Sequence, residues 1–167
     1  MEFELKTLTP EAVPRALAKA ERYRLLNEPG EAESICLDAL AVDPGNQSAL
    51  TMLLLALTDQ FDHDSRAAVA SAWTTVDQLN DQYDRAYYTG LIHERRAKAH
   101  LRRGTPGFGP LAHDWLRQAM ECYERAESIR PAGNDDAILR WNTCARLCSW
   151  HRLGPEPEGG FEPTLDD

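Results

Sequence analysis

The sequence predicts an all-helical protein in which helical hairpins stack side by side. Three observations lead to this prediction. Apolar residues recur at three- and four-residue spacing through most of the chain, as they do in α-helices with one buried face. Proline and glycine interrupt this pattern repeatedly, and no segment shows the alternation typical of a β-strand. A set of small and large residues also recurs at matching offsets, which indicates an internal repeat.

The first predicted hairpin covers about residues 13–43. Pro14 suits the first turn of a helix, because this turn leaves its backbone N–H groups unpaired and proline has none. Leu17, Ala20 and Tyr23 follow at three-residue spacing and form the inner stripe of that helix.

The second predicted hairpin covers about residues 47–80. Asn46 is placed to cap its first helix, which is apolar nearly all round and should therefore lie in the middle of the stack. Ser65 is the expected cap of its second helix. We expect Trp73 in this hairpin, and Trp115 in the next, to be core anchors.

The third predicted hairpin covers about residues 84–131 and contains a Gly- and Pro-rich loop at 104–112. A final helix at about 136–152 should cap the stack. Residues 1–154 are thus expected to form one domain. The remaining segment, 155–167, has five acidic residues and no basic one, which predicts a disordered acidic tail.

The repeat is visible in the small residues of the first and third hairpins. In both hairpins, small residues stand where two helices would touch, a large or branched residue stands beside them, and a proline follows the second helix. The first copy consists of Ala20, Tyr23, Ala32, Cys36, Ala39 and Pro44. The other copy consists of Ala97, His100, Ala119, Tyr123, Ala126 and Pro131.

With these spacings the chain resembles the tetratricopeptide repeat family over about residues 13–131. The resemblance implies a right-handed superhelix of three hairpins plus a capping helix. It also implies a concave groove for a peptide, lined by the first helix of each hairpin. Carried over by spacing, the partner-binding positions in this sequence are Glu21, Arg24, Thr51, Leu55, Glu94, Lys98 and Arg102, with Leu17, Ser48 and Leu91 beside them.

The third groove helix contains five of the chain's 18 basic residues within nine positions. Lys98 and Arg102 are four residues apart and therefore neighbours on the helix surface. Glu94 can neutralise only one of them, so we expect an acidic segment of a partner to satisfy the other. Charge reversal at Lys98 and Arg102 should then weaken partner binding without changing the melting transition. The alternative is an ordinary solvated face.

Glu94 also falls in the apolar stripe of its helix. A carboxylate buried there needs a partner, and Arg140 and Arg146 on the last helix are available for that role.

The charge and composition of the chain argue against several classes of function. The formal net charge of -9 argues against broad nucleic-acid binding and against an anionic membrane surface. No apolar run is long enough to span a bilayer, and the N-terminus does not resemble a signal peptide. Four cysteines in helical settings fit a reducing compartment. We therefore expect a cytoplasmic location.

No arrangement of residues in the sequence predicts catalysis or a cofactor. Cys144, Cys148 and His151 would share one helical face and could bind a soft metal, but buried cysteines on helices act mostly as small hydrophobes. We expect no metal site and no enzyme activity.

The sequence thus predicts a protein-interaction module that binds a peptide or protein segment, through its groove or through the 104–112 loop. Two alternatives stay open. One is a dedicated chaperone or assembly subunit, similar in size, acidity and repeat number to the class II chaperones of type III secretion. The other is a metal- or ligand-binding accessory protein.

Overall fold

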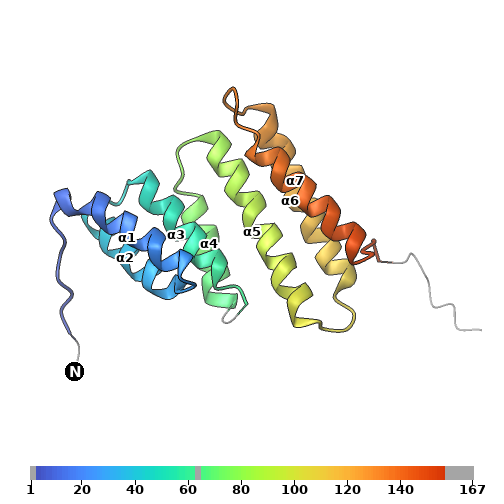
Figure 1. Cartoon of the computed structure of the whole chain (residues 1–167), viewed down its shortest axis with the longest axis horizontal. Coiled ribbons are helices and arrows are strands. Elements are labelled where there is room, and N and C mark those ends of the chain that lie inside the picture. The colour runs from blue at the N-terminus through green and yellow to red at the C-terminus, as the bar shows by residue number, and fades with distance from the viewer. Residues whose placement is uncertain (1–2, 63–64, 157–167) are drawn as a thin grey trace, which may run out of the picture.

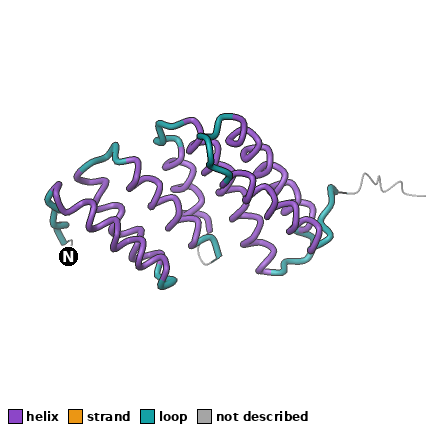
Figure 2. Tube along the Cα trace, turned by 45° about the horizontal axis from the view of Figure 1, so that its top comes forward, coloured by secondary structure: helices purple, strands orange, loops and turns teal. Residues whose placement is uncertain are grey.

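The computed structural model describes residues 3–62 and 65–156, and within these ranges it contains helices and no strand (Figure 2). The all-helical prediction is confirmed. A short 3-10 turn (Pro10–Ala12) precedes α1 (Val13–Leu25), α2 (Pro29–Val42), α3 (Gln47–Asp59), α4 (Ser65–Val76), α5 (Gln82–Arg103), α6 (Gly109–Ser128) and α7 (Asp136–Trp150).

Local signals in the sequence explain several helix ends. The Asn46 side chain accepts a hydrogen bond from the backbone N–H of Ala49, at 2.9 Å, and caps α3 as predicted. Asp81 caps α5 in the same way, so this helix begins two residues earlier than expected. Gly104 ends α5 with a φ of 61°, a conformation that glycine adopts without strain.

The loop after α5 is shorter than the predicted 104–112, because α6 already begins at Gly109 and accommodates Pro110 in its first turn. Ser65 is the first residue of α4, and its side chain, on which the predicted cap depends, lies outside the described part of the structure.

The helices follow one another along the long axis of the molecule, from α1 and α2 at one end to α6 and α7 at the other (Figure 1). Each helix packs against the next one in the chain, and α1 also packs against α3, and α3 against α5. The contact between α5 and α6 is the most extensive, whereas α4 and α5 meet through far fewer residues.

The buried side chains form two main clusters that meet at α5. The first joins α1 to α4 and includes Ile92 and Ala99 of α5. The second joins α5, α6 and α7 and includes Ala97, Ala119 and Tyr123, members of the predicted repeat. Because an α-helix turns once every 3.6 residues, α5 buries two opposite sides in these clusters and leaves two others at the surface.

The two predicted tryptophan anchors differ in burial. Trp115 is 9% exposed and belongs to the second cluster. Trp73 is only half-buried and packs against the first cluster from outside, with its ring edge-on to His93 at 5.0 Å between centroids. The prediction that Trp73 is a buried core anchor is wrong, because the thin contact between α4 and α5 leaves part of its ring open to solvent.

We expect Trp73→Ala to lower the free energy of unfolding by about 2 kcal/mol, below the 3–5 kcal/mol typical of a fully buried tryptophan. Trp150, which is 72% exposed, supplies the control, and its replacement by alanine should have little effect. Urea unfolding measures both. A loss of about 4 kcal/mol or more for Trp73→Ala would show that its ring is more deeply buried.

The predicted acidic tail, 155–167, falls outside the described residues from 157 onward, and Pro155 and Glu156 are exposed. Among the described helices, none is both long enough and apolar enough to cross a membrane.

Candidate functional site

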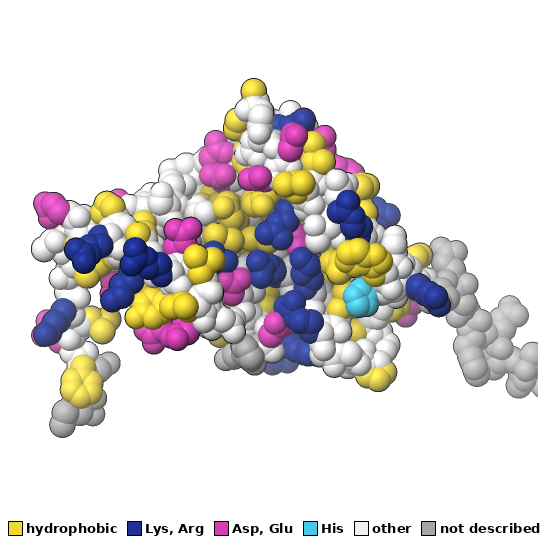
Figure 3. All heavy atoms as spheres, viewed as in Figure 1, with side chains coloured by type: hydrophobic (Ala, Val, Ile, Leu, Met, Phe, Trp, Pro, Cys, Tyr) yellow, Lys and Arg dark blue, Asp and Glu magenta, His cyan; other side chains and the backbone are white. Residues whose placement is uncertain are grey.

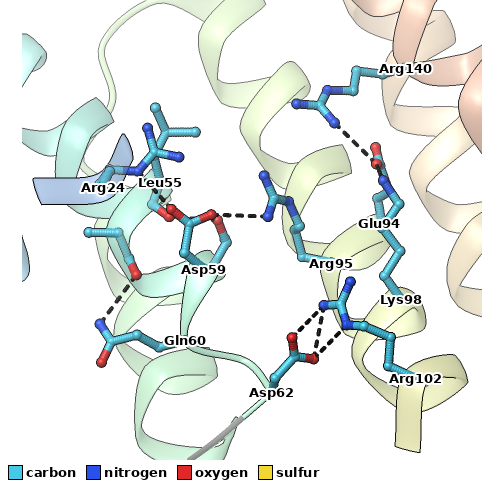
Figure 4. A network of polar contacts seen from close by, with 12 residues as sticks. Arg24, Leu55, Asp59, Gln60, Asp62, Glu94, Arg95, Lys98, Arg102 and Arg140 are labelled. Atoms are coloured by element: carbon cyan, nitrogen blue, oxygen red, sulfur yellow. Dashed lines mark hydrogen bonds and ion pairs between the residues drawn. The ribbon is translucent and has the colours of Figure 1, made fainter. Parts of the chain in front are cut away.

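Five cationic side chains lie together with three carboxylates on the face of the molecule that α1, α3, α5 and α7 share (Figure 4). We call these eight charged residues the basic strip. They are Arg24, Asp59, Asp62, Glu94, Arg95, Lys98, Arg102 and Arg140.

Asp59 joins three helices within the strip. Its carboxylate on α3 accepts from Arg24 Nε of α1 at 2.8 Å and from Arg95 Nη1 of α5 at 3.0 Å. The three side chains are about one-fifth exposed, so this arrangement is more shielded from water than an ordinary surface ion pair. Asp59 thus holds α1 and α5 to the same point on α3.

Arg102 has a carboxylate partner of its own within the chain. Its guanidinium group lies 2.8 Å from Asp62, which follows α3. The expectation that only a partner's acid could neutralise Arg102 is therefore wrong. The Asp62 pairing depends on the packing of α3 beside α5, which helix spacing within α5 could not reveal.

Glu94 is the completely buried member of the strip. It accepts a hydrogen bond from the Tyr123 hydroxyl at 2.6 Å and is paired with Lys98 and with Arg140, the latter at 3.2 Å. The expected ion pair with Arg140 is confirmed, and Arg146 is exposed instead. Burial, followed by the nearby Glu94 charge, raises the pKa of Tyr123 well above 10.0, so its hydroxyl stays protonated and donates.

The prediction that Glu94 contacts a partner is wrong, because no partner atom can reach a side chain with 0% exposure. The predicted charge reversal at Lys98 must also be corrected. A carboxylate in place of Lys98 would stand beside buried Glu94, so this substitution should destabilise the fold.

The other predicted groove positions differ in how far they are exposed to solvent. Arg24 and Leu55 lie side by side next to Asp59 (Figure 4), and Leu55 and Thr51 are half-buried. Glu21 is exposed. Leu91, at 1% exposure, belongs to the core and not to the surface.

Sequence reasoning missed Asp59 and Asp62, and it counted Arg95 among the five basic residues of the third groove helix without naming it as a partner-binding position. A signal for Asp59 existed, because it lies one helical turn after Leu55 and therefore on the same face. Arg95 likewise lies three residues before Lys98. Nothing local indicated Asp62, which lies beyond the end of α3.

The strip is locally cationic although the chain as a whole is acidic. It holds five cations and three carboxylates, and both Asp59 and Glu94 are shared between two cations. Figure 3 shows Lys and Arg side chains gathered over α5 in the middle of this face. The strip can therefore accept further negative charge, in a chain whose formal charge is -9.

The cysteine thiols are poor candidates for a nucleophile or a metal ligand. Burial raises the pKa of the Cys36 thiol to about 12, and burial together with Glu94 raises that of Cys144 further. Such thiols stay protonated near neutral pH, whereas nucleophiles and metal ligands are thiolates. Within the described residues, no group of three or more His, Cys, Asp or Glu side chains is placed to hold a metal ion.

His93, on the far side of α5 from the strip, gives a testable pH dependence. Burial, with the nearby charges of Arg96 and Arg125, lowers its pKa from 6.5 to about 4. Between these values the unfolded chain binds a proton that the folded chain does not, so the free energy of unfolding falls as the pH drops through this window. Because His93 is half-buried, we expect it to contribute a loss of roughly 1–2 kcal/mol between pH 7 and pH 4.5.

Urea unfolding of wild type and of His93→Phe at the two pH values isolates this contribution. The variant should lose less stability on acidification than wild type, because only the other titrating groups then act. Equal losses in both proteins would show that His93 titrates normally in the fold.

Comparisons of the chain with protein-family models, curated proteins and solved structures found no match.

Proposed function

We propose that the chain is a protein-interaction module that binds an acidic segment of another protein across the basic strip, with no catalytic role. The packing of α1 against α3, and of α3 against α5, supports this proposal. It brings the first helices of the predicted hairpins onto one face, where a tetratricopeptide-type superhelix would hold a peptide. The proposed module is cytoplasmic.

The observation that carries the proposal is the excess of cations in the strip. A carboxylate shared between two guanidinium or ammonium groups leaves donors of both free for a ligand, and guanidinium groups hold carboxylates in two-pronged hydrogen bonds. Arg102 is 54% exposed and Arg95 is 23% exposed. An incoming acidic segment should therefore meet Arg102 first and then Arg95, with half-buried Leu55 next to Arg24 and Asp59 for an apolar side chain.

Arg95→Gln with Arg102→Gln tests the proposal, because glutamine keeps the length and polarity of the side chains and removes their charge. The probe is a short fluorescein-labelled peptide of alternating Glu and Leu, measured by anisotropy. We expect the double variant to bind it at least about tenfold more weakly than wild type, a difference of about 1.4 kcal/mol. Binding should also weaken with salt, because exposed charges are screened over about 10 Å at 0.1 M.

The matched control is Arg117→Gln with Arg130→Gln, which removes two charges outside the strip. Arg117 lies on α6 and is 62% exposed, and Arg130 follows α6 and is 33% exposed. These changes should leave peptide affinity nearly unchanged. Equal binding of a Lys–Leu peptide, or equal weakening by both double variants, would refute the assignment of the strip.

A further inference from the structure

A pocket of about 480 Å³ opens between α4 and α5, where the two helices meet through few residues. It lies on the side of α5 turned away from Lys98 of the strip, because its α5 residues occupy different positions of the helical turn. Its lining consists of Phe61, Arg66, Val69, Ala70, Trp73, Arg96, Ala99, His100 and Arg103.

Three arginines and no carboxylate appear among these lining residues. Arg96 is held in place, with its guanidinium group 4.2 Å from the centre of the Trp115 ring. Arg103 donates to the backbone carbonyl of Phe61 at 2.7 Å. The positive charge of the pocket is therefore partly fixed before any ligand arrives, which lowers the entropic cost of binding an anion.

Apart from the arginines and His100, the lining residues are apolar. Trp73 and Phe61 contribute aromatic rings, and Trp73 is held edge-on by His93. The His100 ring stacks on Phe108 at 4.8 Å between centroids and meets the edge of Trp115 at the same distance. The Nδ1 atom of His100 is itself buried and has no hydrogen-bond partner within the described structure.

We propose that this pocket binds a small organic anion in which one carboxylate is attached to a flat apolar ring system. The ring would lie against Trp73 and the aliphatic wall, and the carboxylate would face Arg66 and Arg103. The volume falls within the range of small-molecule sites, roughly 300–1,000 Å³, whereas an extended peptide needs a longer groove. This site is separate from the basic strip and does not depend on the proposed function.

Indole N–H signals in two-dimensional NMR of the full chain test the proposal, with 2-naphthoate as the probe. The chain has four tryptophans, and only Trp73 lines the pocket, with Trp115 behind Arg96. The Trp73 signal should shift in a saturable manner with naphthoate, and that of Trp115 to a smaller extent. The signals of Trp141 and Trp150 should stay in place and serve as internal controls.

The neutral isostere 2-naphthamide and inorganic phosphate separate the two parts of the recognition. Each should bind at least about tenfold more weakly than naphthoate, about 1.4 kcal/mol, because each lacks one of the two features. Equal affinity for naphthamide would show that the arginines do not select an anion. Equal affinity for phosphate would show that the apolar wall takes no part. Either result overturns the proposal, as does a naphthoate titration that leaves Trp73 unmoved.

Two variants locate the site. Arg66→Gln with Arg103→Gln should abolish the preference for naphthoate over naphthamide, while Arg117→Gln should preserve it. Ala70→Phe fills the pocket from an exposed position of α4 without a change of charge, so it should abolish binding of both naphthalene ligands. Undiminished naphthoate binding by Ala70→Phe would place the ligand elsewhere.

Discussion

Glu94→Ala should lower the free energy of unfolding by about 3–5 kcal/mol, the largest effect that we expect from a single substitution. The change removes the carboxylate that the Tyr123 hydroxyl, Lys98 and Arg140 share. It leaves the buried Tyr123 hydroxyl and the Lys98 ammonium group without this acceptor, and it opens a cavity between α5 and α6. Chemical denaturation measures the loss.

Glu121→Ala is the matched control, because it also removes a glutamate from an ion pair with an arginine. Glu121 is 54% exposed and pairs with Arg117 one turn away on α6. Its loss should cost about 0.5 kcal/mol or less. A similarly small loss for Glu94→Ala would contradict the burial of Glu94 and the three-partner arrangement around it.

Gly90→Ala should cost about 3 kcal/mol, although alanine favours a helix by about 1 kcal/mol over glycine. A Cβ atom at this position would lie 2.8 Å from Cε1 of Tyr123 and 3.1 Å from Cβ of Cys122. The Tyr123 ring cannot turn aside, because its hydroxyl is bonded to Glu94. The α5–α6 interface would have to separate.

Gly30→Ala provides the control for Gly90→Ala. Gly30 lies in the first turn of α2, and a Cβ there would meet nothing within 4 Å. This substitution should be neutral or stabilise the protein by up to about 1 kcal/mol. Thermal unfolding of the two variants should therefore shift in different directions or by very different amounts. A neutral Gly90→Ala would contradict the close approach of α5 and α6.

Much of the fold could be predicted because its signals are local. Helix ends depend on caps such as Asn46 and on prolines such as Pro14, which act within one turn. The repeat spacing of Ala97, Ala119 and Tyr123 identified side chains that do share one cluster. The start of α6 inside the predicted 104–112 loop is harder to predict, because a proline such as Pro110 fits a loop as well as a first helical turn.

The site was harder to predict because its interactions join separate helices. Asp59 pairs with Arg24 and Arg95, which are 35 and 36 residues away in the chain. Helix periodicity places each of these residues on a face, but it does not say which faces meet or at what height. The same limit applies to Arg102, whose partner Asp62 lies 40 residues away. The pairing of Glu94 with Arg140 could be anticipated only because a buried carboxylate requires a cation.

The most direct test of the proposed interaction is selection from a random peptide library displayed on phage, with the wild-type chain as bait. The account predicts enrichment of sequences rich in Asp and Glu, and loss of that enrichment when Arg95→Gln with Arg102→Gln is the bait. Enrichment of neutral or basic sequences, or of the same acidic sequences by the double variant, would contradict binding of an acidic segment at the basic strip.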